Sequence, residues 1–155
     1  MANYFKTYFK DNKSIIKNVF KKDNLIYIFT GDNTNSAAID LKSKIIESGI
    51  FNCIVNEKKN FSHGRFINYE HLNNKISIYF KQKNESLYEN KLLGYLDKEK
   101  TIIIESKYND VICEFDLLIA IQYLIYYIFN YLNIDISKPT YSEDAMNIYF
   151  YKGQL

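Results

Sequence analysis

The sequence predicts an α/β domain in which helices cover a parallel sheet of four or five strands. Short runs of β-branched and aromatic residues alternate along the chain with longer segments of helical periodicity. The connections between them are short, and neither a low-complexity linker nor an internal repeat interrupts the alternation. A chain of 155 residues has the size of one ordinary domain, so we expect residues 1–155 to form a single domain.

Apolar runs of strand character mark the predicted strands. The first run, LIYIFT, is typical of a buried strand because it is rich in β-branched and aromatic residues. A run close to the C-terminus is expected either to add a last short strand or to pack against the core. The predicted strands are residues 25–30, 51–55, 75–80 and 101–106, with 147–151 as the last of them.

Apolar residues recur at helical spacing in the remaining segments. Gly49 is a suitable C-terminal stop for one of these helices, and Ser86 is a candidate cap for another. The polar segment NYEHLNN, which contains His71, is expected to be an exposed loop. The predicted helices are residues 4–21, 37–49, 86–96 and 112–132.

The most apolar run, residues 115–134, is long enough to span a membrane. Gln122 and Asn130 interrupt it, and tyrosine is frequent within it. We therefore predict a buried helix of an α/β domain and no association with a membrane. The N-terminal segment has no continuous apolar core and does not resemble a signal peptide, so a cytoplasmic location is expected.

Composition excludes several classes of function. The net charge is only +2, and the lysines are scattered among asparagines and glutamates, so no nucleic-acid partner is expected. Cys53 and Cys113 lie inside apolar runs without a CxxC neighbour, which gives no zinc or redox motif. They are interpreted as small buried side chains of a reduced protein. Neither a metal nor a cofactor is expected.

The loop after the first predicted strand carries small hydrogen-bonding residues. These residues precede a helix whose N-terminal amides could hold an anion or a sugar hydroxyl. Ordinary capping and turn chemistry explains the same residues, and neither GxGxxG nor GxxxxGK[ST] is present to indicate a dinucleotide or P-loop site. The candidate ligand-binding residues of this loop are Thr30, Gly31, Asn33, Thr34, Asn35 and Ser36.

A second candidate site follows the second predicted strand, where His63, Gly64 and Arg65 are consecutive. A neutral imidazole can move a proton near pH 7, glycine lets the backbone approach a ligand, and arginine can bind a phosphate or carboxylate with two hydrogen bonds. A loop histidine is more often a bystander, so the triplet alone is a weak signal. Glu47, in the last turn of the helix 37–49, is by periodicity a solvated residue.

The order of these segments resembles the SIS (sugar isomerase) family, and more narrowly the second SIS domain of glucosamine phosphate synthase-like proteins. FTGDNTNSAAIDLKSKIIESG resembles the family's glycine loop and the following helix, which ends in a glutamate. FSHGR resembles the K-H-G-P turn, and KISIYFKQKNESLYENKLLGYL resembles the next strand, asparagine-glutamate turn and helix. TIIIES and the long apolar helix complete the pattern, which covers roughly residues 20–135.

The resemblance implies a three-layer, flavodoxin-like sandwich whose core spans about residues 20–135, with the N-terminal helix and the C-terminal tail packing on it. It also implies binding of a sugar phosphate or a derivative. In the isomerase members, the glutamate that ends the helix moves a proton between adjacent carbons. The histidine of the turn assists ring opening, often across a subunit boundary. These catalytic roles fall on Glu47 and His63.

The chain departs from the family pattern in three places, one of which is the C-terminal lysine loop of the synthase, which has no clear counterpart here. Arg65 stands where the family has a proline after H-G. The phosphate-binding S-x-S-G-x-T loop of the first SIS domain has no match, and KQKNES occupies the corresponding position. The chain therefore resembles half of a two-domain protein, and we expect a homodimer or pairing with another SIS domain.

Three functions are compatible with the sequence, because SIS domains serve more than one role. The favoured one is a protein that binds a sugar phosphate or derivative in a sensing or regulatory role. The first alternative is an aldose–ketose isomerase in which Glu47 is the base, His63 opens the ring and Arg65 holds the phosphate. The second alternative is an assembly subunit that binds no ligand and pairs with another SIS chain.

Overall fold

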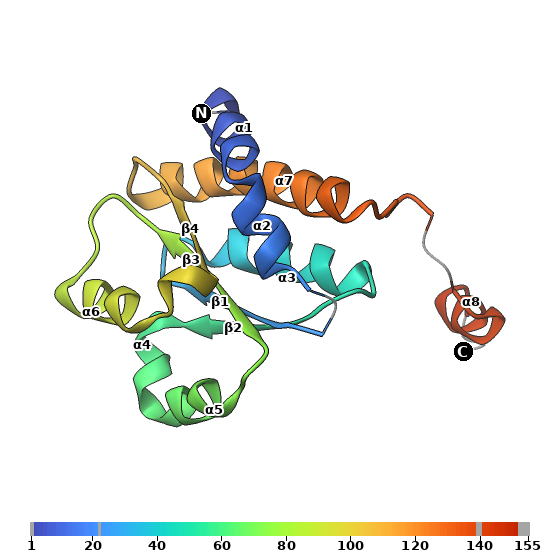
Figure 1. The fold of residues 1–155 in the computed structure, drawn as a ribbon, viewed down its shortest axis with the longest axis horizontal. Helices are drawn as coiled ribbons and strands as arrows, with labels where there is room; N and C mark the ends of the chain where they lie inside the picture. The colour runs from blue at the N-terminus through green and yellow to red at the C-terminus, as the bar shows by residue number, and fades with distance from the viewer. Residues whose placement is uncertain (1, 22, 139–140, 152–155) are drawn as a thin grey trace.

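The computed structural model describes residues 2–21, 23–138 and 141–151 (Figure 1). Four parallel strands form one sheet in the order β2-β1-β3-β4, and the predicted fold class is confirmed. The strand order reverses between β1 and β3, which is where ligands bind in open α/β sheets. The strands are β1 (Leu25–Thr30), β2 (Asn52–Glu57), β3 (Lys75–Lys81) and β4 (Thr101–Glu105).

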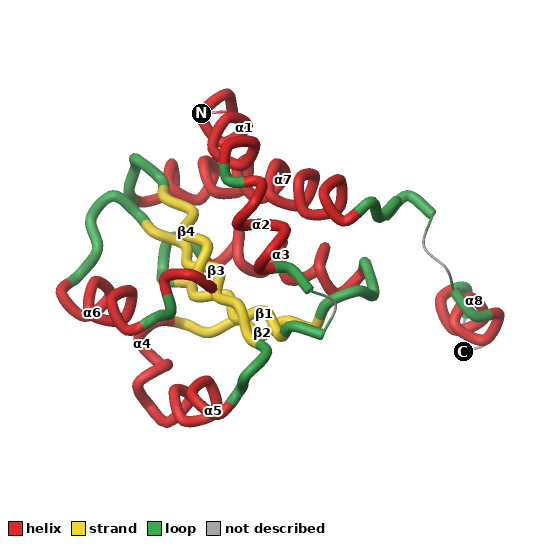
Figure 2. Tube along the Cα trace, viewed as in Figure 1, coloured by secondary structure: helices red, strands yellow, loops and turns green. Residues whose placement is uncertain are grey.

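One face of the sheet is covered by α1 (Ala2–Asp11), α2 (Lys13–Val19), α3 (Asn35–Glu47) and α7 (Asp110–Leu132) (Figures 1 and 2). α7 is long and apolar enough to cross a membrane by length and composition, but half of its most apolar window is buried. It packs against α1, α2 and α3 in the manner of a core helix. Its buried residues include Leu117, Ile121, Leu124 and Ile128.

The opposite face carries shorter elements over an aromatic cluster. The strands β1 and β3 contribute the buried rings of Tyr27, Phe29 and Tyr79, because alternate strand residues point to opposite faces. The rings of Phe61 and Tyr69 pack edge-on against Phe29. The covering elements are α4 (Lys58–Asn60), η1 (Phe61–Arg65), α5 (Phe66–His71), α6 (Leu87–Tyr95) and η2 (Lys98–Lys100).

Two predicted features near the chain ends were wrong in detail. The helix predicted for residues 4–21 is two helices, broken at Asn12, whose side-chain amide donates to the Tyr8 carbonyl oxygen. Residues 147–151 were expected either to add a last short strand or to pack against the core, and they do neither. Most of the segment belongs to α8 (Glu143–Tyr149), and all of its residues are exposed. Ser142 caps α8 by accepting a hydrogen bond from the Ala145 amide.

The segment between β2 and β3 also differs from the prediction. Residues 66–71 form α5, whereas most of this stretch was expected to be loop. Tyr69 explains the difference, because its buried ring joins the aromatic cluster and its hydroxyl hydrogen-bonds to Ser77 at 2.8 Å. The predicted cap of α6 is confirmed, since Ser86 and Glu89 form a reciprocal capping box.

Candidate functional site

The carboxyl ends of β1 and β2 open into a cavity of about 500 Å³. The loop after β1, the start of α3 and the segment after β2 form its walls. The cavity lies at the carboxyl edge of the sheet, where parallel α/β proteins bind ligands, but on the β2 side of β1 and not at the β1–β3 switch point. The lining residues are Thr30, Gly31, Asp32, Asn35, Val55, Glu57, Asn60 and Arg65.

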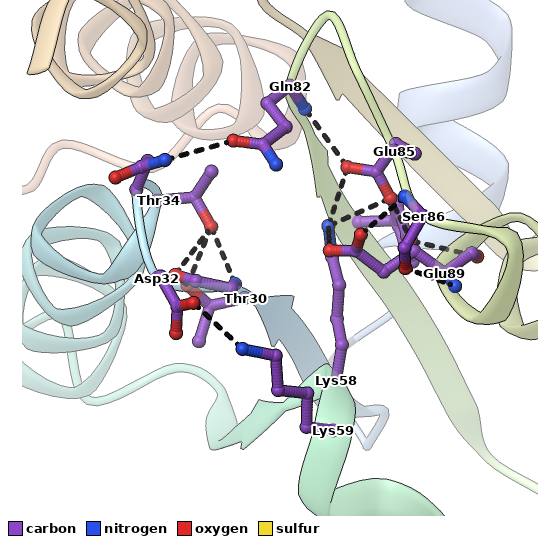
Figure 3. A network of polar contacts seen from close by, with 12 residues as sticks. Thr30, Asp32, Thr34, Lys58, Lys59, Gln82, Glu85, Ser86 and Glu89 are labelled. Carbon is purple, nitrogen blue, oxygen red and sulfur yellow. Dashed lines mark hydrogen bonds and ion pairs between the residues drawn. The ribbon is translucent and has the colours of Figure 1, made fainter. Parts of the chain in front are cut away.

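The loop after β1 is held by its own threonines (Figure 3). The hydroxyls of Thr30 and Thr34 lie 2.8 Å apart, and the Gly31 amide donates to the Thr34 hydroxyl at 2.8 Å. The Asn33 side chain donates to Gln82 of the loop after β3 at 3.2 Å. Of these predicted ligand-binding residues, Thr30 and Gly31 line the cavity, whereas Thr34 is buried and Asn33 bridges two loops.

The N-terminus of α3 is partly occupied by a carboxylate of the chain itself. The Ser36 amide, one of the groups predicted to hold an anion, donates to Glu114 of α7 at 2.9 Å. A carboxylate at a helix N-terminus is stabilised by the amides and by the helix dipole. Asn35, at the same helix end, lines the cavity. An incoming anion would therefore meet an N-terminus that already carries negative charge.

Two carboxylates and two amide side chains give the cavity a hydrogen-bonding wall. Asp32 pairs with Lys59 at 2.8 Å, and both side chains are largely exposed. Glu57 accepts a hydrogen bond from the Asn60 amide. Carboxylate and amide groups of this kind can bind the hydroxyls of a polar ligand.

The HGR turn contributes one residue to the cavity. Arg65, the only arginine in the sequence, lines it. His63 and Gly64 are exposed and do not. Gly64 has φ +93°, a conformation that other residues rarely adopt, which explains the glycine at this turn.

Glu47 lies at the other end of α3 from the cavity. The twelve steps from Asn35 to Glu47 correspond to about 18 Å along a helix axis. Glu47 is exposed and borders a separate cavity next to α8. Within one chain, Glu47 and His63 therefore do not share a cleft. Their predicted catalytic roles stay predictions that depend on a second chain.

A buried charged network lies beside the cavity, between the ends of β2 and β3 (Figure 3). Lys58 donates to both oxygens of Glu85, at 2.9 and 3.1 Å, and their side chains are only 1% and 2% exposed. Tyr79 donates to Glu85 at 2.6 Å, and its ring lies 4.3 Å from the Lys58 ammonium. Burial, together with the hydrogen bond to Glu85, raises the pKa of Tyr79, so its hydroxyl stays a donor.

Glu89 joins this network from α6. Burial alone would raise the pKa of its carboxyl, but hydrogen bonds from Ser86 and the charge of Lys58 outweigh burial and lower the pKa. Gly31 packs directly against the network. A Cβ at this position would lie 3.4 Å from a Glu89 carboxylate oxygen and 3.9 Å from the Lys58 nitrogen. The network thus supports the floor of the loop after β1.

Sequence reasoning missed the charged residues of the site. Lys58 and Lys59 are adjacent in a polar run, yet one is buried and the other exposed. Their position in the sequence could have identified them. Asp32, Lys58 and Glu85 each follow closely after the carboxyl end of a strand. Among the residues that the structure describes, no group of three or more histidines, cysteines, aspartates or glutamates is arranged to hold a metal ion.

No family model matches the sequence, and no curated protein matches it. Solved structures with the same fold do match. A proposed phosphosugar isomerase from Bacillus subtilis aligns with TM-score 0.73 and 15% identity over 90% of this chain and 46% of that one. A proposed phosphosugar isomerase from Salmonella typhimurium aligns with TM-score 0.68 and 12% identity over 90% of this chain and 47% of that one.

The C-terminal domain of glucosamine-fructose-6-phosphate aminotransferase from Francisella tularensis aligns with TM-score 0.58 and 12% identity, over 87% of this chain and 42% of that one. The chain thus spans about half the length of these three structures. Identities this low establish the fold alone. The four-stranded parallel sheet between two helical layers is the α/β fold that this chain shares with these structures.

Proposed function

We propose that this chain binds a sugar phosphate or a related derivative in the cavity at the ends of β1 and β2, in a sensing or regulatory role. The observation that carries the proposal is the make-up of this cavity. Its wall combines hydroxyl-binding carboxylates and amides with the chain's only arginine. A volume of about 500 Å³ is in the range of small-molecule sites.

The two kinds of group suit the two parts of such a ligand. Asp32 and Glu57 can accept hydrogen bonds from sugar hydroxyls, and Asn35 can both donate and accept. The guanidinium of Arg65 can bind two oxygens of a phosphate at once. Since Glu114 already occupies the Ser36 amide, we assign the phosphate to Arg65 rather than to the N-terminus of α3.

Catalysis is the less favoured function for the same cavity. Aldose–ketose isomerisation needs a base within hydrogen-bonding reach of the proton that it removes. Glu47 lies at the far end of α3, and His63 does not line the cavity. The isomerase alternative with Glu47 as base and His63 for ring opening therefore requires these residues from a second chain at this site.

One observation favours the second alternative, an assembly subunit without a ligand. Cationic and amide groups near the cavity are already satisfied by the chain's own carboxylates. Lys58 is held by Glu85, Lys59 by Asp32, and the Ser36 amide by Glu114. Under this alternative, no sugar phosphate would bind, and the partner would be another SIS chain.

Binding can be tested by thermal shift and calorimetry with hexose, pentose, heptulose and amino-sugar phosphates. A ligand that binds only the native state raises the melting temperature, and at 100 times its Kd it stabilises the protein by about 2.7 kcal/mol. We expect at least one ligand of this panel to bind. Arg65→Ala should weaken its binding at least tenfold and Asp32→Asn less, whereas Lys91→Ala, an exposed cation on α6, should have no effect.

The outcomes separate the three functions. Binding that depends on Arg65, with the sugar recovered unchanged by NMR, supports the proposal. Conversion of the bound sugar would establish the isomerase instead. If nothing in the panel binds, or if Arg65→Ala binds as tightly as the parent chain, the proposed site is wrong.

A further inference from the structure

The C-terminal helix α8 makes little contact with the rest of its own chain. It lies apart from the sheet and its covering helices in Figure 1, and every one of its residues is exposed. A cavity of about 740 Å³ separates it from Glu47 at the end of α3. The exposed apolar side chains of this segment are Tyr141, Met146, Ile148, Tyr149, Phe150 and Tyr151.

A helix of this kind needs a surface to pack on. α8 has seven residues, and isolated helices shorter than about 12–15 residues are marginal in water. Exposed apolar patches larger than a few hundred Å² commonly mark interaction sites. The described residues of one copy supply little packing for α8, so its stability must come from another surface.

The solvent-facing surface of α3 and α7 also carries exposed apolar side chains. Two contacts hold these helices side by side, from the Ser36 amide to Glu114 at 2.9 Å and from Gln122 to Asp40 at 3.2 Å. We call this surface the outer α3–α7 face. Its exposed apolar residues are Ile39, Ile46, Val111, Ile112, Phe115 and Tyr126.

We propose that α8 of one copy of this chain docks on the outer α3–α7 face of a second copy, and that the exchange is reciprocal. Both surfaces come from this chain, so a second copy brings a receiving face for each α8. An interface with two-fold symmetry then closes with two copies and leaves neither apolar surface open.

One pair of charges on the two surfaces is complementary, while Asp40 and Glu114 of the receiving face are already engaged by Lys44 and the Ser36 amide. The first turn of α8 carries Glu143 and Asp144. On the outer α3–α7 face, the exposed Lys42 lies between Ile39 and Ile46 along one side of α3. An acidic helix start can therefore meet a lysine while the apolar side chains pack together.

The area available is sufficient for a stable dimer. At ~150 Å² per ring, the four aromatic side chains of the segment, which are 60–80% exposed, present roughly 400 Å². If all of this area were covered, two copies with comparable loss on the receiving faces would bury at most about 1,600 Å², the size of a standard specific interface. The ten residues 133–142 can span up to about 30 Å, enough to reach a neighbouring copy.

Sedimentation equilibrium of the full chain between about 1 and 100 μM tests the association. We expect a dimer whose Kd rises at least tenfold in Tyr149→Ala/Phe150→Ala and in Phe115→Glu. Leu87→Glu replaces an exposed apolar residue on α6, on the other side of the sheet, and should leave the Kd unchanged. A chain that is monomeric throughout, or a dimer that is indifferent to both sets of changes, would overturn the proposal.

Cysteine cross-linking shows which copy receives the helix. In a Cys53→Ser background, a tagged chain with Ile39→Cys is mixed with an untagged chain with Ile148→Cys and mildly oxidised. We expect a disulfide that joins tagged to untagged chains. The double variant Ile39→Cys/Ile148→Cys is examined alone at low concentration. If it forms only an intrachain disulfide, and the mixture forms none, α8 docks on its own chain and the exchange is refuted.

Discussion

Replacing Lys58 by methionine should destabilise the protein strongly. Methionine keeps the length of the side chain but removes the cation that faces Glu85, whose side chain is 2% exposed. Removing one partner of a buried ion pair costs about 3–5 kcal/mol, because the remaining charge is left buried and uncompensated. For a protein of this size, each kcal/mol lowers the melting temperature by about 2–4 °C, so a decrease of roughly 6–20 °C is expected.

Thermal and urea unfolding followed by circular dichroism measure this loss, and the neighbouring residue supplies a matched control. Lys59 also pairs with a carboxylate at 2.8 Å, but its side chain and that of Asp32 are 66% and 69% exposed. Water screens exposed pairs, which contribute little to stability, so Lys59→Met should leave the melting temperature almost unchanged.

A third variant tests whether the uncompensated charge of Glu85 causes the loss of stability. Lys58→Met/Glu85→Gln removes the stranded charge, while the glutamine oxygen can still accept the hydrogen bond from Tyr79. We expect the double variant to regain part of the stability lost in Lys58→Met. The reasoning is refuted if the double variant is as unstable as Lys58→Met, or if Lys58→Met and Lys59→Met have equally small effects.

Three further predictions concern the edge of the sheet. Because the folded state lowers the pKa of Glu89 below its ordinary 4.5, stability should fall as the pH drops below about 4.5, and Glu89→Gln should flatten this dependence in acid unfolding curves. Gly64→Ala should lower the free energy of unfolding by about 1–3 kcal/mol in urea titrations, because alanine is strained at φ +93°; an unchanged midpoint would contradict this. Glu114→Gln removes a negative charge from the N-terminus of α3, so it should strengthen sugar-phosphate binding in calorimetry, and weaker binding would speak against the placement of the site.

The positions of the strands were predictable because local amino-acid composition alone identifies a buried strand. LIYIFT, KISIYF and TIIIES form β1, β3 and β4 within one residue at either end. β1 and β3 occupy the centre of the sheet, where both faces are buried, which explains their nearly continuous apolar runs. Parallel pairing followed from the alternation with helices.

The incorrect secondary-structure predictions have physical causes that the local sequence pattern does not reveal. Residues 147–151 are apolar and aromatic enough for a strand, but a strand needs a sheet edge, and the capped segment from Ser142 onward forms a helix instead. The predicted helix 4–21 has the correct apolar spacing on both sides of Asn12. Its break arises where the Asn12 amide bonds to the Tyr8 carbonyl, a competition with the helix that spacing does not reveal.

The candidate site was predictable in position but not in charge. The rule that ligands bind at the carboxyl ends of parallel strands located the loop after β1 and the HGR turn, and Arg65 does line the cavity. The pairing of Lys58 with Glu85 joins residues 27 positions apart, and burial alone separates Lys58 from Lys59. Such burial is decided by tertiary packing, so one sequence cannot reveal it.

The rim of the cavity is ordered before any ligand arrives, and this has a kinetic consequence. Asn33 joins Gln82 across two loops, and the Gly31 amide is fixed by a threonine hydroxyl. Ordering a backbone residue costs about 1–2 kcal/mol, so a rim that is already fixed spares the ligand much of that cost. Entry then need not wait for a loop to close. The observed association rate should rise linearly with ligand concentration, without the plateau that a slow closing step would impose.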